Sequence, residues 1–145
     1  MLDDHSSQKL RALNISVARY LSGVPITGLD HVQLAAPPGS EGQARRFYGE
    51  LLGLVEVEKP APLRARGGVW FELGAQQLHV GIDADFMPAR KAHPALAVPA
   101  EELDRLAERI EAAGAEVKWD RELHGVRRFY SQDPWGNRLE LIAAG

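Results

Sequence analysis

The 145-residue sequence contains no cysteine, which excludes disulfide bonds, thiolate metal ligands and a cysteine nucleophile. It also lacks any apolar run close to the ~20 residues that span a bilayer, so no membrane partner is predicted. The N-terminus has no basic segment followed by an apolar core, which is the pattern of a secretory signal. We therefore predict a cytoplasmic protein.

The sequence also lacks a large excess of either charge sign, because the formal net charge is only −3. Such a chain has no basic footprint for nucleic acid, and no nucleic-acid partner is predicted. The apolar content of 45% and the charged content of 26% are typical of a globular protein. The length is that of one ordinary domain with a sizeable core.

The sequence does contain an approximate internal repeat. The segment DHVQLA at 30–35 corresponds to AHPALAV at 92–98, and residues 71–82 correspond to residues 129–142. His31 then matches His93 at an offset of 62 positions, and His79 matches Glu140 at an offset of 61. Scattered histidines would seldom show two near-equal offsets. We therefore predict that these four residues bind a divalent metal ion.

Hydrophobic periodicity predicts the same order of elements in both copies: a strand, a helix and three strands. The first copy covers about residues 28–82 and the second about 92–143. Ser40 is a predicted helix N-cap, and Gly53 suits the position after the helix C-terminus. The predicted strands cover 31–35, 54–58, 69–73, 77–82, 93–98, 115–119, 127–132 and 137–143. One predicted helix begins after Ser40 and ends before Gly53, and the other covers 101–113.

Residues 1–24 stand outside the repeat, and apolar residues at helical spacing predict an N-terminal helix over 7–21. The predicted fold class is α+β. Two βαβββ modules over residues 27–143 form a curved mixed sheet around a cavity. The potential ligands alternate with core positions along the strands, so they should point into that cavity.

Four segments carry a resemblance to a known group: LDHV at 29–32, RFYGELLGL at 46–54, AHPALAV at 92–98 and DPWGNRLEL at 133–141. With them, the chain resembles the vicinal oxygen chelate superfamily, which includes glyoxalase I, fosfomycin-modifying enzymes, extradiol dioxygenases and bleomycin-binding proteins. The resemblance covers about residues 27–143. It is specific for the fold and much less so for the reaction, because one scaffold hosts many chemistries.

The resemblance implies a metal held on the first, fourth, fifth and eighth strands. His31, His93 and Glu140 match family ligands, whereas His79 stands where glyoxalase I carries a glutamate. Imidazole and carboxylate ligands suit zinc, nickel, iron or manganese. The implied function is a metal-dependent lyase, isomerase or epimerase that acts on a small substrate with adjacent oxygens through a stabilised enolate. Glu140 is then the only carboxylate ligand and the expected proton carrier.

Four further residues are predicted to bind substrate. Tyr130 matches a cavity tyrosine of the fosfomycin enzymes, and Arg128 lies two positions earlier on the same strand face. Trp70 and Gln33 should line the cavity from two other strands. The alternative for Arg128 is a cross-strand ion pair.

Two other functions stay open at this point. Iron would fit an extradiol dioxygenase, and the fold also serves bleomycin-type proteins that bind a drug or metabolite without a metal. Chains of this size in the superfamily commonly form homodimers. The modules then pair either within one chain or between two chains, and the sequence does not decide between these arrangements.

Overall fold

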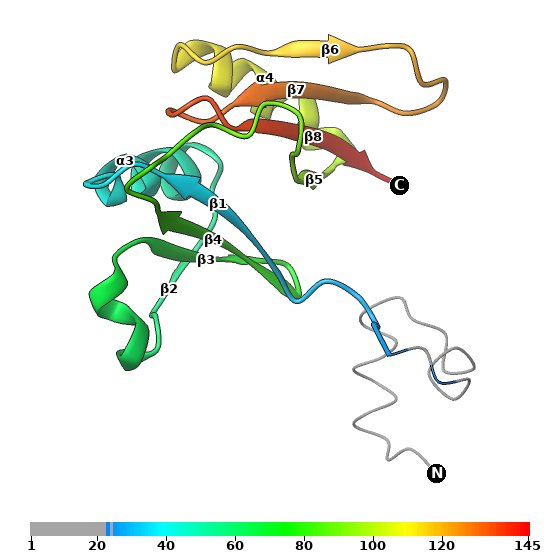
Figure 1. Cartoon of the computed structure of the whole chain (residues 1–145). Coiled ribbons are helices and arrows are strands. Elements are labelled where there is room, and N and C mark those ends of the chain that lie inside the picture. Colours follow the sequence, from blue (N-terminus) through cyan, green and yellow to red (C-terminus); the bar gives the residue numbers. More distant parts are fainter. Residues whose placement is uncertain (1–22, 24) are drawn as a thin grey trace.

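The computed structural model describes residue 23 and residues 25–145 (Figure 1), so the helix predicted over 7–21 lies outside the described residues. Among the described residues, no helix has the length and apolar character needed to cross a membrane. The elements in chain order are β1 (His31–Ala36), α3 (Glu41–Ala44), η1 (Arg45–Leu51), β2 (Glu56–Val57), η2 (Ala61–Arg66), β3 (Val69–Leu73), β4 (Gln76–Ile82), β5 (Ala95–Pro99), η3 (Ala100–Glu102), α4 (Leu103–Ala112), β6 (Lys118–Asp120), β7 (Arg128–Gln132) and β8 (Arg138–Ala144).

The strands form two four-stranded sheets with the same plan. The first has the order β1-β4-β3-β2 and the second has the order β5-β8-β7-β6. In each sheet the first and last strands of the module pair in parallel, and the other neighbours are antiparallel. The prediction of an α+β fold built from two βαβββ modules with mixed sheets is therefore confirmed.

One face of each sheet is buried under a helical segment, and the other face carries the polar residues. In β1, Leu34 and Ala36 are buried, whereas His31 and Gln33, which alternate with them, are exposed. A strand directs successive side chains to opposite faces, so this alternation defines a core face and an open face. The open face is the one predicted to hold the ligands.

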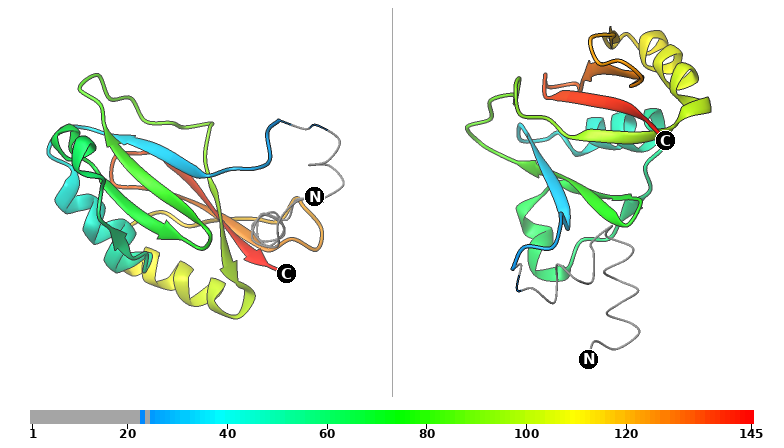
Figure 2. Two further views of the ribbon diagram at one scale, coloured as in Figure 1. Left: turned by 90° about the horizontal axis from the view of Figure 1, so that it is seen from below. Right: turned by 90° about the vertical axis from the view of Figure 1, so that its right-hand side faces the viewer.

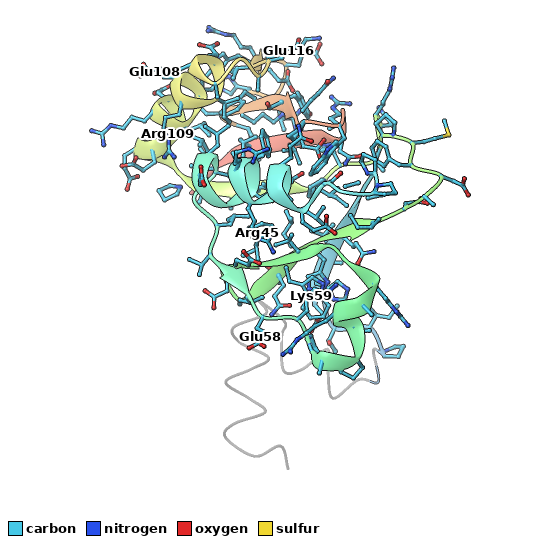
Figure 3. All side chains as sticks on the ribbon, turned by 90° about the vertical axis from the view of Figure 1, so that its left-hand side faces the viewer. Arg45, Glu58, Lys59, Glu108, Arg109 and Glu116 are labelled. Atoms are coloured by element: carbon cyan, nitrogen blue, oxygen red, sulfur yellow. The ribbon has the colours of Figure 1, made fainter. Side chains whose placement is uncertain are left out.

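Helix α4 covers the second sheet with an apolar stripe. Leu103, Ala107 and Ile110 recur at helical spacing and are all buried. Gly114, with φ +86°, follows the end of the helix. Figures 2 and 3 show α4 and the first helical segment on the same side of the molecule, with the strands of both sheets beyond them. The open faces of both sheets therefore look toward the opposite side.

The first helical segment differs from a plain α-helix. After the single α-helical turn of α3, the segment η1 forms π-helical bonds, such as the one from the Leu52 amide to the Phe47 carbonyl at 2.9 Å. The Ser40 hydroxyl does not cap the helix as predicted, because it donates to the Pro37 carbonyl instead. Gly53 follows the helix with φ +81°, as predicted.

Two strands of the second module begin two or three residues later than predicted. Strand β5 begins at Ala95 rather than at residue 93, since Pro94 has no N–H to donate to the ladder. The Pro94 carbonyl still accepts a hydrogen bond from the Glu140 amide at 3.0 Å. Strand β6 begins at Lys118 rather than at residue 115, because the Ala115 amide still bonds to the Ile110 carbonyl of the helix end at 3.1 Å.

The two modules dock through the turn before β8. Tyr48 donates from its hydroxyl to Asp133 Oδ2 at 2.8 Å, and Asn137 Nδ2 donates to the Ala35 carbonyl at 2.8 Å. Asp133 is 5% exposed and also accepts from the Trp135 and Asn137 amides. Burial and the adjacent carboxylate raise the pKa of Tyr48 well above its ordinary value, so its hydroxyl stays protonated and donates.

A second link between the modules runs from helix to helix. Arg109 of α4, labelled in Figure 3, donates from its guanidinium to the Leu51 carbonyl at 2.7 Å and to the Glu50 carbonyl at 3.2 Å. These carbonyls lie at the C-terminal end of the first helical segment, where a positive charge is favourable. Both links fix how the two open faces lie relative to each other.

One buried polar atom among the described residues lacks a partner, and it gives a stability prediction. Ser131 is buried in β7, and its hydroxyl makes no hydrogen bond. We expect Ser131→Ala to raise the free energy of unfolding by about 1 kcal/mol, because it removes an unsatisfied buried group. Ser40→Ala is the matched control: Ser40 is equally buried but is bonded to Pro37, so its loss should destabilise. Urea unfolding of both variants checks the prediction, and destabilisation by Ser131→Ala would contradict it.

Candidate metal and substrate site

The internal repeat is preserved in the strand register of the two sheets. In the first sheet Gln33 lies opposite His79, and in the second sheet Ala95 lies opposite Glu140. Residue 95 follows residue 33 by 62 positions, and residue 140 follows residue 79 by 61, which are the offsets found in the sequence. The two modules therefore place His79 and Glu140 at equivalent points of equivalent sheets.

In the second module, His93 and Glu140 lie in contact. His93 Nε2 is 3.1 Å from Glu140 Oε2, and Glu140 is only 6% exposed. The other carboxylate oxygen, Oε1, accepts from Arg128 Nη1 at 3.1 Å. Arg128 is held in turn by Asp120, whose Oδ2 accepts from Nε at 2.9 Å and from Nη2 at 2.6 Å. Glu140 therefore presents one oxygen to His93 while Arg128 fixes the other.

The hydrogen bonds of His93 place its Nε2 atom where His93 and Glu140 could bind one cation together. Its Nδ1 lies 2.7 Å from the Lys91 carbonyl, which can only accept, so Nδ1 carries a proton. In the neutral imidazole Nε2 then has a lone pair, and this lone pair faces a carboxylate oxygen. That contact is attractive when a proton lies between the two atoms, or when both atoms bind one metal ion.

In the first module, His31 and His79 lie side by side. Asp30 Oδ1 is 2.9 Å from His31 Nδ1, which leaves His31 Nε2 free to bind a metal ion. This is the arrangement in which a carboxylate orients a metal-binding histidine. His79 is 4% exposed, and burial, followed by the charge of His31, lowers its pKa. A lowered pKa favours the neutral imidazole that metal binding requires.

The orientation of His79 is less favourable for a metal ligand. Its ring lies parallel to Trp70 at 3.8 Å and close to parallel with His31 at 4.3 Å between centroids. Ring nitrogens bind metal ions in the plane of the ring, so two stacked rings do not point at one ion. Its Nε2 is also bonded to Gln77 Oε1 at 2.8 Å. His79 therefore contributes a flat aromatic wall, and His31, which is exposed, has room to turn.

The four predicted ligands form two separate pairs in this chain. No group of three His, Cys, Asp or Glu side chains that could hold a metal ion occurs within residue 23 and residues 25–145. The chemistry of the donors fits a divalent ion, with imidazole nitrogens and one carboxylate. The assembled four-residue site stays a prediction, because each module supplies one half of it.

The four predicted substrate residues lie on the same open faces. Trp70 and Gln33 line a hollow of about 160 Å³ on the first sheet. Tyr130 and Arg128 line one of about 660 Å³ on the second sheet, and the Tyr130 ring is 5.5 Å from the ring of His93. Arg128 makes the cross-strand ion pairs that were its alternative role, so its guanidinium is already engaged. The role of these residues in binding substrate stays a prediction.

Three further residues complete this surface, and sequence reasoning gave no role to two of them, Asp30 and Asp120. Asp30 orients His31, and its position beside the histidine was an available signal. Asp120 holds Arg128 from the opposite position on the neighbouring strand, which only the strand register reveals. Arg138 stacks on Tyr130, with its guanidinium carbon 4.0 Å from the ring centroid. Its position two residues before Glu140 placed it on the same face.

Comparisons with known proteins find a matching family and similar solved structures. The Glyoxalase-like domain family matches residues 39–142. A glyoxalase family protein from Bacillus anthracis has a similar crystal structure with a TM-score of 0.78 and 45% sequence identity. That similarity covers 83% of this chain and 97% of the other. No curated protein matches this chain.

More distant structures share the fold. Lactoylglutathione lyase from Agrobacterium tumefaciens is 23% identical, with a TM-score of 0.65 over 83% of this chain and 96% of that chain. A mutant fosfomycin resistance protein from Listeria monocytogenes, complexed with Mn(II) and 1S,2S-dihydroxypropylphosphonic acid, is 23% identical. Its TM-score is 0.68 over 83% of this chain and 94% of that chain. With the match over residues 39–142 and the close relative from Bacillus anthracis, this chain belongs to the glyoxalase-like domain family of the vicinal oxygen chelate superfamily.

Proposed function

We propose that this protein is a metal-dependent enzyme of glyoxalase type, and that two chains build each active site. His31, with His79 beside it, would come from one chain, and His93 and Glu140 from the other. The observation that carries the proposal is the arrangement of the His93–Glu140 pair. One carboxylate oxygen of Glu140 accepts from Arg128, and the other faces Nε2 of His93. The Nδ1 atom of His93 already donates to the Lys91 carbonyl. Such a pair is one half of a site for a divalent cation.

The direction of the open faces supports pairing between chains. Both faces look to the same side of the chain, and the ligand pairs lie on different modules. A second chain related by a two-fold axis can place its first module over the second module of its partner, and the reverse. This arrangement completes two equivalent sites. It also covers the exposed strand positions of the open faces, including His31, Gln33 and Ala95.

The chain's own residues have distinct roles in this site. A bound divalent ion would supply Lewis-acid polarisation of two adjacent substrate oxygens. Glu140 would accept a proton from the substrate carbon beside those oxygens and return it, as the only carboxylate of the predicted set. Arg128 holds the carboxylate in one orientation, and Tyr130 provides a wall beside His93. This division of roles favours lyase, isomerase or epimerase chemistry on a small substrate.

One observation favours a second candidate, a protein that binds a flat aromatic drug or metabolite without catalysis. Trp70, His79 and His31 form a continuous stack of rings across the first sheet. Such a stack presents a surface for another planar ring. This candidate needs no metal, so metal binding separates the two functions.

The test is elemental analysis of protein purified without a chelating column, before and after incubation with Zn²⁺, Ni²⁺, Mn²⁺ or Fe²⁺. We expect about one ion per chain, lost in the double variant His93→Ala/Glu140→Ala, because one imidazole ligand and one carboxylate ligand disappear. The matched control is His124→Ala/Glu108→Ala, which removes an exposed histidine and an exposed glutamate that are not among the four predicted ligands. Absence of metal after incubation, or its retention in the first variant, would refute the proposal in favour of the binding protein.

A further inference from the structure

Unpaired positive charge gathers on the open face of the second sheet, although the chain as a whole is acidic. Among the described residues, neither Arg138 nor Lys118 nor Arg90 has a carboxylate within ion-pair distance. Arg128, on the same face, differs from them because Asp120 and Glu140 already occupy its guanidinium. The positive charge that remains available therefore includes the first three residues, and Arg121 adds to it at the larger of two hollows.

Two hollows meet at Arg138. One of about 660 Å³ is lined by four basic side chains, including Lys118 and Arg138, against two acidic ones. One of these acids is Asp120, which Arg128 already neutralises. The other hollow, of about 310 Å³, is lined by Arg90, Lys118 and Arg138 against a single acid. Both hollows therefore carry a positive potential, which attracts anions.

Tyr130 holds Arg138 ready for a ligand. The guanidinium carbon lies 4.0 Å from the ring centroid, which is a cation–π contact. Among the described residues this guanidinium makes no ion pair, so its N–H donors stay free for an oxyanion, which the fork geometry of arginine suits. The Arg138 amide is bonded to the Ala89 carbonyl at 2.8 Å, which brings Arg90 to the start of β8.

We propose that Arg138, supported by Lys118 and Arg90, forms a subsite for an anionic group of the substrate, a carboxylate or a phosphoryl-type group. This inference rests on the proposed function in one respect, namely that the ligand is the substrate. Arg138 and Glu140 lie on one face of β8, two residues and so about 6.6 Å apart. The substrate would thus carry adjacent oxygens at one end and an anion at the other. Arg128 then positions Glu140, and Arg138 selects the substrate.

The test measures anion binding by chelator-treated protein, so that a metal ion cannot hold the anion itself. Inorganic phosphate and acetate are titrated separately, and the backbone amide NMR signals of β6, β7 and β8 are followed. We expect saturable shifts centred on Arg138. Arg138→Gln should weaken binding of the preferred anion about tenfold, because a charge-assisted pair of hydrogen bonds is lost. The preferred probe distinguishes a carboxylate from a phosphoryl-type group.

The matched control is Arg105→Gln, which removes the same charge from the exposed surface of α4 on the other side of the sheet. It should change the dissociation constant less than twofold, and circular dichroism should show both variants folded. Equal weakening by both variants, or shifts that do not saturate, would overturn the subsite. Anion binding without any metal binding would refute the proposed enzyme and leave the subsite intact, whereas the reverse result would refute the subsite alone.

Discussion

Gly68→Ala is expected to lower the free energy of unfolding by about 3 kcal/mol, which is a large share of the stability of a domain of this size. Gly68 precedes β3 and has φ +86°, a conformation that side chains with a Cβ rarely adopt. A Cβ atom there would lie 2.3 Å from the Val80 carbonyl oxygen. Because this oxygen belongs to the backbone of β4, the contact can be relieved only by moving a strand.

Gly39→Ala separates the two causes of this cost. Gly39 has φ +81°, but nothing lies within 4 Å of the Cβ that alanine would add. Its substitution should therefore cost only the backbone strain, about 1 kcal/mol. Urea unfolding of both variants gives the comparison. Equal losses would contradict the close approach of Gly68 to Val80.

Gly68→Ala should also disturb the candidate site, because Gly68 belongs to a loop that supports this site. The Gly68 amide donates to Glu41 Oε1 at 3.1 Å, which ties the loop to the first helical segment. This bond is the largest cause of the lowered pKa of Glu41. Val80, which the new Cβ would contact, directly follows His79 in β4. A displaced β4 would move His79 relative to Trp70, so ring stacking should weaken along with stability.

The fold could be predicted from the sequence because both copies of the repeat carry the same alternation. Val32 and Leu34 were predicted to face the core and His31 and Gln33 the open face; in the structure Leu34 is buried, Val32 packs against the core, and His31 and Gln33 are exposed. The ends of helices were less predictable where a side chain can form a hydrogen bond with more than one nearby backbone group. The Ser40 hydroxyl bonds backward to Pro37 rather than capping the helix, and no pattern of residue types distinguishes these two bonds.

For the candidate site, the sequence predicts which strand face each residue takes but not the contacts that it makes. Periodicity shows which face a side chain takes, and this placed His93 and Glu140 on the open face of one sheet. It does not show which residue a side chain contacts across strands. The link from Asp120 through Arg128 to Glu140 depends on the register of β6, β7 and β8. The separation of His31 from Glu140 likewise depends on how the modules dock.

The docking contacts explain why one chain keeps the two ligand pairs apart. Tyr48 bonds to Asp133, and Asn137 bonds to Ala35, so the first helical segment lies against the turn before β8. Bringing the two open faces together within one chain would break these buried bonds. Leaving Asp133 buried without its partners would be costly. Pairing with a second chain keeps them all intact.

Mixed dimers should therefore regain a metal site that each parent variant lacks. His31→Ala removes a ligand from the first module, and Glu140→Ala removes one from the second. If each site joins the first module of one chain to the second module of another, a heterodimer of these variants contains one intact site and one doubly altered site. We expect about half of the wild-type metal content, against little in either parent homodimer.

The heterodimer can be isolated by refolding the two variants together with different affinity tags that do not bind metal, followed by purification on each tag in turn. Elemental analysis then gives the metal content per dimer. A heterodimer of His93→Ala with Glu140→Ala is the control: both changes lie in the second module, so neither site is intact. If the sites form within single chains, the first heterodimer also stays empty, and if the protein is a monomer no doubly tagged species is recovered. A half-occupied first heterodimer beside an empty control would assign the two halves of each site to different chains.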